Sequence, residues 1–224
     1  MKYAVVYEKS SNGWGGSPSD LSVSSVAKVL PLCSRHNGQG TKLSNIGLSI
    51  PELVPHFQLI MPDLRGHGRS TTLAKPFRHN EAAEDMLALL DHLRIETCKG
   101  LGISGGGNVL LHMAAMQPER IQGMVLVSAT PYFPDQAHRI MRGYSQTVPG
   151  ADPQIRALLA SVEAFADSHD DMAFTPPKLA TIQARTLIVQ GASILCIPSH
   201  YPSKWPKPFR TPACGFCPTA VMDP

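Results

Sequence analysis

The chain has 224 residues, of which 43% are hydrophobic and 17% charged, a composition typical of one globular domain with a packed core. The net charge of +3 is too small to indicate a nucleic-acid partner, and no stretch approaches the ~20 apolar residues of a membrane span. The odd count of five cysteines disfavours an extracellular disulfide framework. We therefore expect a cytoplasmic protein with a small-molecule substrate and without a membrane or nucleic-acid partner; the oligomeric state is left open.

Residues 1–34 form an atypical N-terminal segment. Residues 3–9 alternate as in a short strand, Asn12-Gly13 marks a turn, and residues 26–32 are apolar. Further along, residues 57–61 read as a strand and 80–93 as an amphipathic helix with Asn80 as its N-cap. Acidic residues in the first turns of this helix suit its dipole.

Strands and helices then alternate. We predict a strand over 98–103, a helix over 107–116, a strand over 124–127 and a strand over 186–189. Residues 131–180 interrupt this order with a loose polar segment that contains one clear helix, beginning at Pro153 after Asp152. Alternation with apolar strands predicts an α/β fold, a mostly parallel sheet with helices on both faces, within residues 35–191.

Residues 192–224 contain seven prolines and no apolar period, so we expect an irregular tail. Three cysteines and a histidine in this tail are of metal-ligating types, which leaves zinc binding open as an alternative to a disordered extension. These residues are Cys196, His200, Cys214 and Cys217. Their spacing lacks the two tight ligand pairs of small zinc modules, and we assign no metal site.

The strongest chemical signal is the sequence Gly102-Ile103-Ser104-Gly105-Gly106 between a predicted strand and a predicted helix. Glycines two residues before and after a serine give room for a sharp strand-to-helix turn that exposes the hydroxyl. The N–H of Gly105 is then placed to stabilise an oxyanion at the helix N-terminus. We predict Ser104 as a nucleophile; the alternative is a glycine-rich turn that only packs.

A second cue is the run Pro62-Asp63-Leu64-Arg65-Gly66-His67-Gly68 directly after the strand over 57–61. Together with the serine motif, it resembles the strand-end loop and nucleophile elbow of the α/β-hydrolase family, and the resemblance covers roughly residues 43–191. It implies a serine hydrolase that acts on a small ester or related acyl compound without a cofactor. It further implies that residues 131–180 form a cap over the substrate pocket, and that His67 is structural.

In this family an early loop supplies oxyanion donors, and the matching residues here are Asn37 and Gly38 within the run 36–40. Asn37 stands where glycine is typical, so the same run also suits a polar surface turn. The catalytic order of the family is serine, acid, histidine. After Gly191, where the acid is expected, the only carboxylate is Asp223.

Candidates for the missing acid and base therefore come from less usual places. Asp135, after the strand over 124–127, is the candidate acid, and His200, the only histidine after the last predicted strand, is the candidate base. His112 lies on the nucleophile helix and suits the core, while His138 and His169 belong to the predicted cap.

One hypothesis accounts for these absences: the hydrolase-like sequence stops near Gly191, and the fold is truncated at its C-terminal end. Residues 1–20 add a short resemblance to the opening strand pair of HicB-type antitoxins, carried by Tyr3-Ala4-Val5-Val6-Tyr7 and Asn12-Gly13-Trp14. The alternative to an active enzyme is thus a composite or truncated, catalytically inactive hydrolase remnant.

Overall fold

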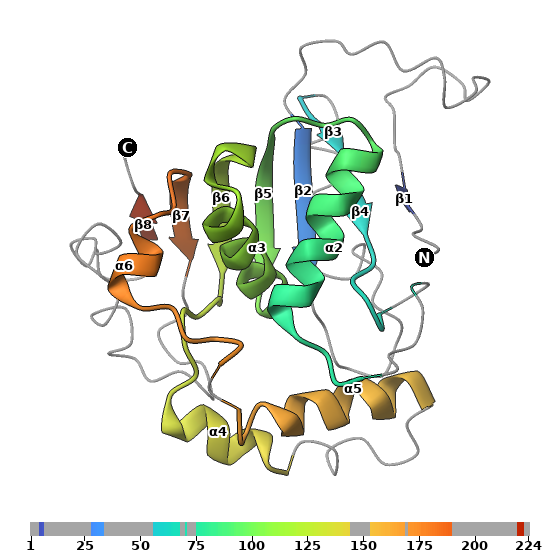
Figure 1. Cartoon of the computed structure of the whole chain (residues 1–224), viewed down its shortest axis with the longest axis vertical. Coiled ribbons are helices and arrows are strands. Elements are labelled where there is room, and N and C mark those ends of the chain that lie inside the picture. Colours follow the sequence, from blue (N-terminus) through green and yellow to red (C-terminus); the bar gives the residue numbers. More distant parts are fainter. Residues whose placement is uncertain are drawn as a thin grey trace.

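The computed structural model describes residues 5–6, 28–33, 56–67, 70, 75–143, 153–168, 170–189 and 219–221. Its main feature is a six-stranded sheet in the order β3-β2-β5-β6-β7-β8 (Figure 1). The strands are β2 (Lys28–Cys33), β3 (Gln58–Leu59), β5 (Cys98–Ile103), β6 (Ile121–Val127), β7 (Arg185–Val189) and β8 (Thr219–Val221). All neighbours are parallel except β7 and β8. The predicted mostly parallel α/β sheet is confirmed.

The centre of the sheet matches the sequence prediction closely. The predicted strand over 98–103 is β5, the strand over 124–127 extends back to Ile121 in β6, and the strand over 186–189 gains one residue in β7. Apolar strands such as these have both faces covered in parallel sheets. The register places Ile103 opposite Val127, so β5 and β6 end side by side.

The N-terminal part contributes to this architecture in two places. Two-residue strand β1 (Val5–Val6) pairs antiparallel with β4 (Met61–Pro62), so that the predicted strand over 57–61 is split into β3 and β4. Strand β2 falls within residues 1–34, which the sequence pattern places outside the α/β domain of residues 35–191. In the structure, β2 lies between β3 and β5 in the main sheet. The rest of the segment with the antitoxin resemblance lies outside the described residues, and that resemblance stays a prediction.

Two helices pack side by side along the sheet (Figure 1). Helix α2 (His79–His92) contacts α3 (Gly105–Met116), and α3 lies against β2, β5 and β6. The core between them is formed by fully buried side chains such as Met86, Leu90, Leu110 and Met113. A short 3-10 helix, η3 (Pro118–Arg120), leads from α3 into β6.

Between β6 and β7 the chain makes an excursion, here called the β6–β7 connection (residues 128–184). It contains α4 (Asp135–Met141), α5 (Pro153–Ala164) and α6 (Pro176–Leu179), of which the sequence predicted only α5. Figure 1 shows α4 and α5 beyond the carboxyl ends of the strands. Among the described helices, none has the length and apolar character needed to cross a bilayer.

Two predictions from local pattern are wrong. Helix α2 begins at His79 with Arg78 as its N-cap residue, so Asn80 is already inside the helix. The tail was expected to hold no regular element, yet β8 pairs antiparallel with β7, Val221 opposite Leu187 and Thr219 opposite Val189. In both cases a distant segment supplies the hydrogen-bond partners, which local periodicity does not reveal.

Candidate active site

Ser104 occupies a strained turn between β5 and α3. Its backbone angles are φ 53° and ψ −125°, a region that residues other than glycine rarely adopt, and the residue is exposed. Its N–H donates to the Val127 carbonyl over 2.8 Å, and its carbonyl accepts the N–H groups of Gly107 and Asn108. The turn is therefore fixed on both sides, with the side chain at the carboxyl edge of the sheet.

Close glycine packing makes this turn possible. A Cβ atom on Gly102 would lie 2.5 Å from the Gly107 Cα atom, and one on Gly107 would lie 2.6 Å from the Ala129 Cβ atom. Helix α3 thus starts directly against the end of β5 and the residues that follow β6. The buried Gly105 is the first residue of α3, and its N–H has no acceptor within the helix. That N–H is available to a negatively charged oxygen at the helix N-terminus.

Of the predicted acid, base and early-loop oxyanion donors, the structure describes only Asp135. Asp135 is the exposed first residue of α4, and no hydrogen bond joins it to any described histidine. The candidate donors Asn37 and Gly38 and the candidate base His200 lie outside the described residues, as do His169 and the cysteines of the open zinc alternative. In the described part of the chain, no group of three or more His, Cys, Asp and Glu side chains is arranged to hold a metal ion.

The described histidines near the core have structural surroundings. The buried His67 pairs its Nδ1 atom with the Arg65 carbonyl over 2.9 Å, and burial lowers its pKa. Arg65 in turn binds Asp85 through two nitrogen atoms and also contacts Glu81, which ties the loop after β4 to the first turns of α2. His138 on α4 is buried and pairs its Nδ1 atom with the Phe165 carbonyl over 2.8 Å.

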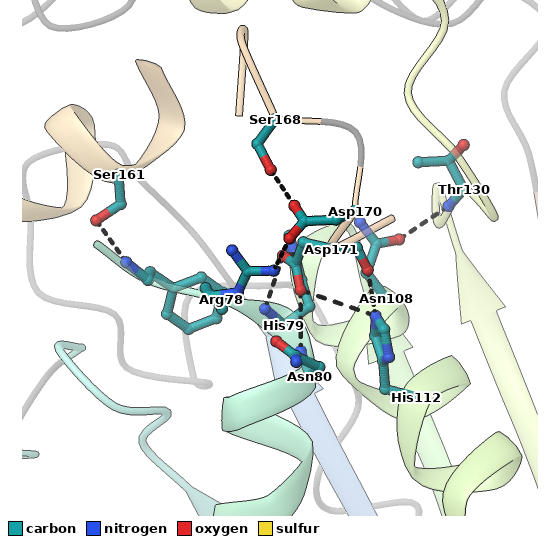
Figure 2. Close-up of polar contacts among 11 residues, drawn as sticks. Arg78, His79, Asn80, Asn108, His112, Thr130, Ser161, Ser168, Asp170 and Asp171 are labelled. Atoms are coloured by element: carbon teal, nitrogen blue, oxygen red, sulfur yellow. Dashed lines mark hydrogen bonds and ion pairs between the residues drawn. The ribbon is translucent and has the colours of Figure 1, made fainter. Parts of the chain in front are cut away.

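A buried polar cluster joins the β6–β7 connection to α2 and α3 (Figure 2). Asp171 accepts hydrogen bonds from the backbone N–H groups of His79 (2.9 Å) and Asn80 (3.2 Å), and its carboxylate lies 2.7 Å from the His79 Nδ1 atom. Its backbone carbonyl accepts from His112 Nε2 over 2.7 Å. Because a carbonyl oxygen only accepts, the Nε2 atom of His112 carries the proton.

Electrostatics in this cluster follow from burial and from these contacts. Burial lowers the pKa of His112 to about 4, so its ring is neutral at pH 7. Burial by itself raises the pKa of the Asp171 carboxyl, but the hydrogen bonds and charge of His79 and the backbone N–H of Asn80 outweigh it and bring that pKa below its ordinary value. The cluster therefore holds one carboxylate that acts as an N-cap of α2 from outside the helix.

Sequence reasoning missed Asp171 and Asn108. A usable signal was present for α3, where Asn108 and His112 are the only polar side chains between Gly105 and Met116. Two polar residues four positions apart on an otherwise apolar helix indicate buried hydrogen bonds. No local pattern distinguished Asp171 from other polar residues of its segment.

Comparison with known proteins agrees with this geometry. The sequence model of the alpha/beta hydrolase fold matches residues 27–169, and the chain belongs to this family. The match begins before β2 and ends within the β6–β7 connection. It includes the Ser104 turn and the close glycine contacts around it.

Curated relatives are matched over part of their length. The chain is 36% identical to 3-oxoadipate enol-lactonase 2 of Acinetobacter baylyi over 92 residues, 41% of this chain and 34% of the lactonase. It is 28% identical to the pimeloyl-[acyl-carrier protein] methyl ester esterase of Aeromonas hydrophila over 152 residues, 60% of this chain and 58% of the esterase. The chain thus spans about a third of the first relative and less than two thirds of the second.

Solved structures share the fold over most of the chain. The enol-lactonase from Burkholderia xenovorans superposes with a TM-score of 0.61 at 20% identity and covers 88% of this chain and 80% of its own. A thermophilic esterase from Thermogutta terrifontis gives a TM-score of 0.64 at 18% identity, with 89% and 78% covered.

Proposed function

We propose that the chain is a serine hydrolase that cleaves a small ester or related acyl compound, with Ser104 as the nucleophile. The observation that carries this proposal is the backbone of Ser104, held at φ 53° and ψ −125° at the exposed junction of β5 and α3. Strain of this kind persists only where the surrounding structure enforces it, and it is typical of functional positions. The relatives support the bond type, because a lactonase and a methyl ester esterase are both named for carboxylic ester bonds.

In the proposed reaction, the Ser104 hydroxyl oxygen attacks the carbonyl carbon and forms a new C–O bond while its proton passes to a general base. The Gly105 N–H and a second donor from Asn37 or Gly38 stabilise the oxyanion. Collapse of this intermediate breaks the ester bond, and the alcohol leaves with the proton. Water then releases the acid and regenerates the serine, with no cofactor involved.

His200 and Asp135 remain the candidate base and acid, and the β6–β7 connection is the candidate cap. Its helices α4 and α5 lie beyond the carboxyl ends of the strands, the edge at which Ser104 is exposed. A small molecule is the expected partner, and membranes and nucleic acids are not.

A second candidate function is a folded protein without hydrolytic activity. In its favour, the Ser104 hydroxyl forms no hydrogen bond with a histidine among the described residues, and Asp135 pairs with none of them. Without a base and an acid, a hydrolase accelerates the reaction at most ~10³- to 10⁴-fold over water, through oxyanion stabilisation and substrate binding.

Labelling with a fluorophosphonate probe decides between the two candidates. We expect the wild-type chain to be labelled and Ser104→Ala to be unlabelled, with hydrolysis of p-nitrophenyl acetate lost in parallel. A folded wild type that neither reacts with the probe nor hydrolyses the ester would contradict the proposal. His200→Ala should abolish labelling if His200 is the base, whereas His92→Ala, on the exposed end of α2, is the matched control.

A further inference from the structure

Two segments of the β6–β7 connection, one near its start and one shortly before α6, are attached to the helix that begins after Ser104. At its start, the Thr130 N–H donates to the Asn108 Oδ1 atom over 2.9 Å. At its return, the Asp171 carbonyl accepts from His112 Nε2 over 2.7 Å. Asn108 and His112 are 3% and 2% exposed and lie one turn apart on α3.

These two segments are also joined to each other. Tyr132 and Ala173 form an antiparallel bridge, and the Phe174 N–H donates to the Pro131 carbonyl over 3.0 Å. The connection therefore leaves and returns as a paired stem, and this stem is held on one face of α3. The contacts at Asn108, Thr130, His112 and Asp171 can be followed in Figure 2.

Asp171 fixes the returning segment of this stem in a second direction. While its backbone carbonyl binds α3, its carboxylate accepts two backbone N–H groups at the start of α2 and pairs with the His79 ring. Asp171 is 3% exposed and His79 is 4% exposed. The position of the stem is thus defined relative to both helices, through hydrogen bonds that are buried except for the partly buried one to the Asn80 N–H.

We propose that Asn108 and His112 are positioning residues that fix the β6–β7 connection relative to Ser104 and thereby set the size of the acyl group that the site accepts. This inference rests on the proposed function. Ser104 is the residue directly before α3, and Asn108 and His112 follow it at four-residue intervals on that helix, so the nucleophile and both stem contacts are held by one element. Loosening a stem contact shifts the connection without moving the turn that holds Ser104.

The consequence is a split between substrates. On this proposal, an acetyl ester bound at Ser104 makes little contact with the connection, whereas the longer octanoyl chain extends against it. His112→Leu removes the donor to the Asp171 carbonyl, and His112→Gln restores an amide N–H in its place. We expect His112→Leu to raise KM for p-nitrophenyl octanoate by about tenfold while kcat and KM for p-nitrophenyl acetate stay within about twofold.

His112→Gln should recover most of the octanoate affinity, and His92→Leu, a histidine on the exposed end of α2, is the matched control and should behave as wild type. Equal losses for both esters in His112→Leu, or no change for either, would overturn the inference. Failure of His112→Gln to recover the affinity while circular dichroism remains native would also overturn it.

Hydrogen exchange followed by mass spectrometry gives a readout that does not depend on catalysis. His112→Leu should accelerate exchange of the Thr130 and Phe174 amides and leave those of β5 unchanged. Unchanged protection at both amides would overturn the inference even if the wild type is inactive. An inactive, unlabelled wild type with accelerated exchange in His112→Leu would overturn the proposed function and the role in acyl size, whereas activity with unchanged exchange would overturn only the positioning role.

Discussion

Gly102 at the end of β5 and Gly107 on α3 approach each other so closely that a methyl group on Gly102 would lie 2.5 Å from the Gly107 Cα atom. The same methyl group would lie 2.7 Å from the Gly106 carbonyl oxygen. Both neighbours are backbone atoms, which have no rotamer to change. The strained Ser104 turn therefore depends on the absence of a side chain at Gly102.

Gly102→Ala should lower the free energy of unfolding by about 1 to 3 kcal/mol, because the added methyl group displaces α3 from the end of β5. Labelling of Ser104 should fall with it. Gly143→Ala is the matched control, since a Cβ atom there meets nothing within 4 Å and the residue is exposed. Chemical denaturation measures the difference, and equal stability of the two variants would contradict the packing argument.

Ser104→Gly and Ser104→Ala separate backbone strain from loss of the hydroxyl. Glycine adopts φ 53° and ψ −125° without the Cβ clash, whereas alanine retains it. We expect Ser104→Gly to be more stable to unfolding than the wild type by about 1 kcal/mol, and Ser104→Ala to be within about 0.5 kcal/mol of it. Thermal unfolding of the three proteins at one pH tests this; a Ser104→Gly variant no more stable than Ser104→Ala would show that the turn stores no strain.

Asp171→Ala should be strongly destabilising. It removes the acceptor for two backbone N–H groups of α2, that of His79 buried and that of Asn80 partly buried, and the partner of the buried His79 ring. We expect a loss of about 3 kcal/mol in the free energy of unfolding. The control is Asp167→Ala, an exposed carboxylate whose ion pair with Arg142 spans 3.3 Å, for which a change below about 0.5 kcal/mol is expected. Similar losses in both variants would argue against a capping role for Asp171.

Stability should depend on pH through His112. Its pKa falls from 6.5 to about 4 on folding because of burial, and Asp171, Lys178 and His79 are the charged or titratable groups that act on it. Between these pH values the unfolded chain binds more protons, so the free energy of unfolding decreases as pH falls from about 6.5 toward 4. His112 alone accounts for roughly 3 kcal/mol of this decrease.

His112→Gln should remove that part of the pH dependence. The unfolding free energy of the wild type minus that of the variant is then constant above about pH 6.5 and falls as the pH approaches 4. The Asp171 carboxyl adds its own loss only below its ordinary pKa of 3.8, because its folded pKa is lower still. Parallel curves for the two proteins between pH 4 and 6.5 would mean that the ring of His112 is not buried in the neutral form.

The pairing of β8 with β7 protects an edge of the sheet. Deletion of residues 219–224 removes the partner of Leu187 to Val189, and an unpaired apolar edge strand promotes association between chains. We expect concentration-dependent oligomers in size-exclusion chromatography for this variant. Deletion of residues 222–224, which leaves β8 intact, is the control, and equal elution of the two variants would indicate that β8 does not protect the edge.

Much of the fold follows from local sequence. The strand over 98–103, Ser104 and the helix after it could be predicted because their signals are contiguous: an apolar strand, glycines at close-packing positions and an apolar helix ended by Gln117-Pro118. The helix start at Asn80 was wrong because the side chain that caps α2 is absent from the neighbouring sequence. It comes from Asp171, which is 92 positions from His79.

The sequence by itself therefore determined the α/β class and the position of the candidate nucleophile, since both rest on periodicity and on steric needs within a few residues. The family followed from the resemblance of its two contiguous motifs, residues 62–68 and 102–106, to the α/β-hydrolase family. Tertiary structure alone decided which groups satisfy the buried polar atoms at the ends of these elements. Asp171 caps α2, Asn108 and His112 hold the β6–β7 connection, and β8 pairs with β7. These partners meet only when distant segments pack together, and a hydrogen bond depends on distance and angle in space rather than on spacing along the chain.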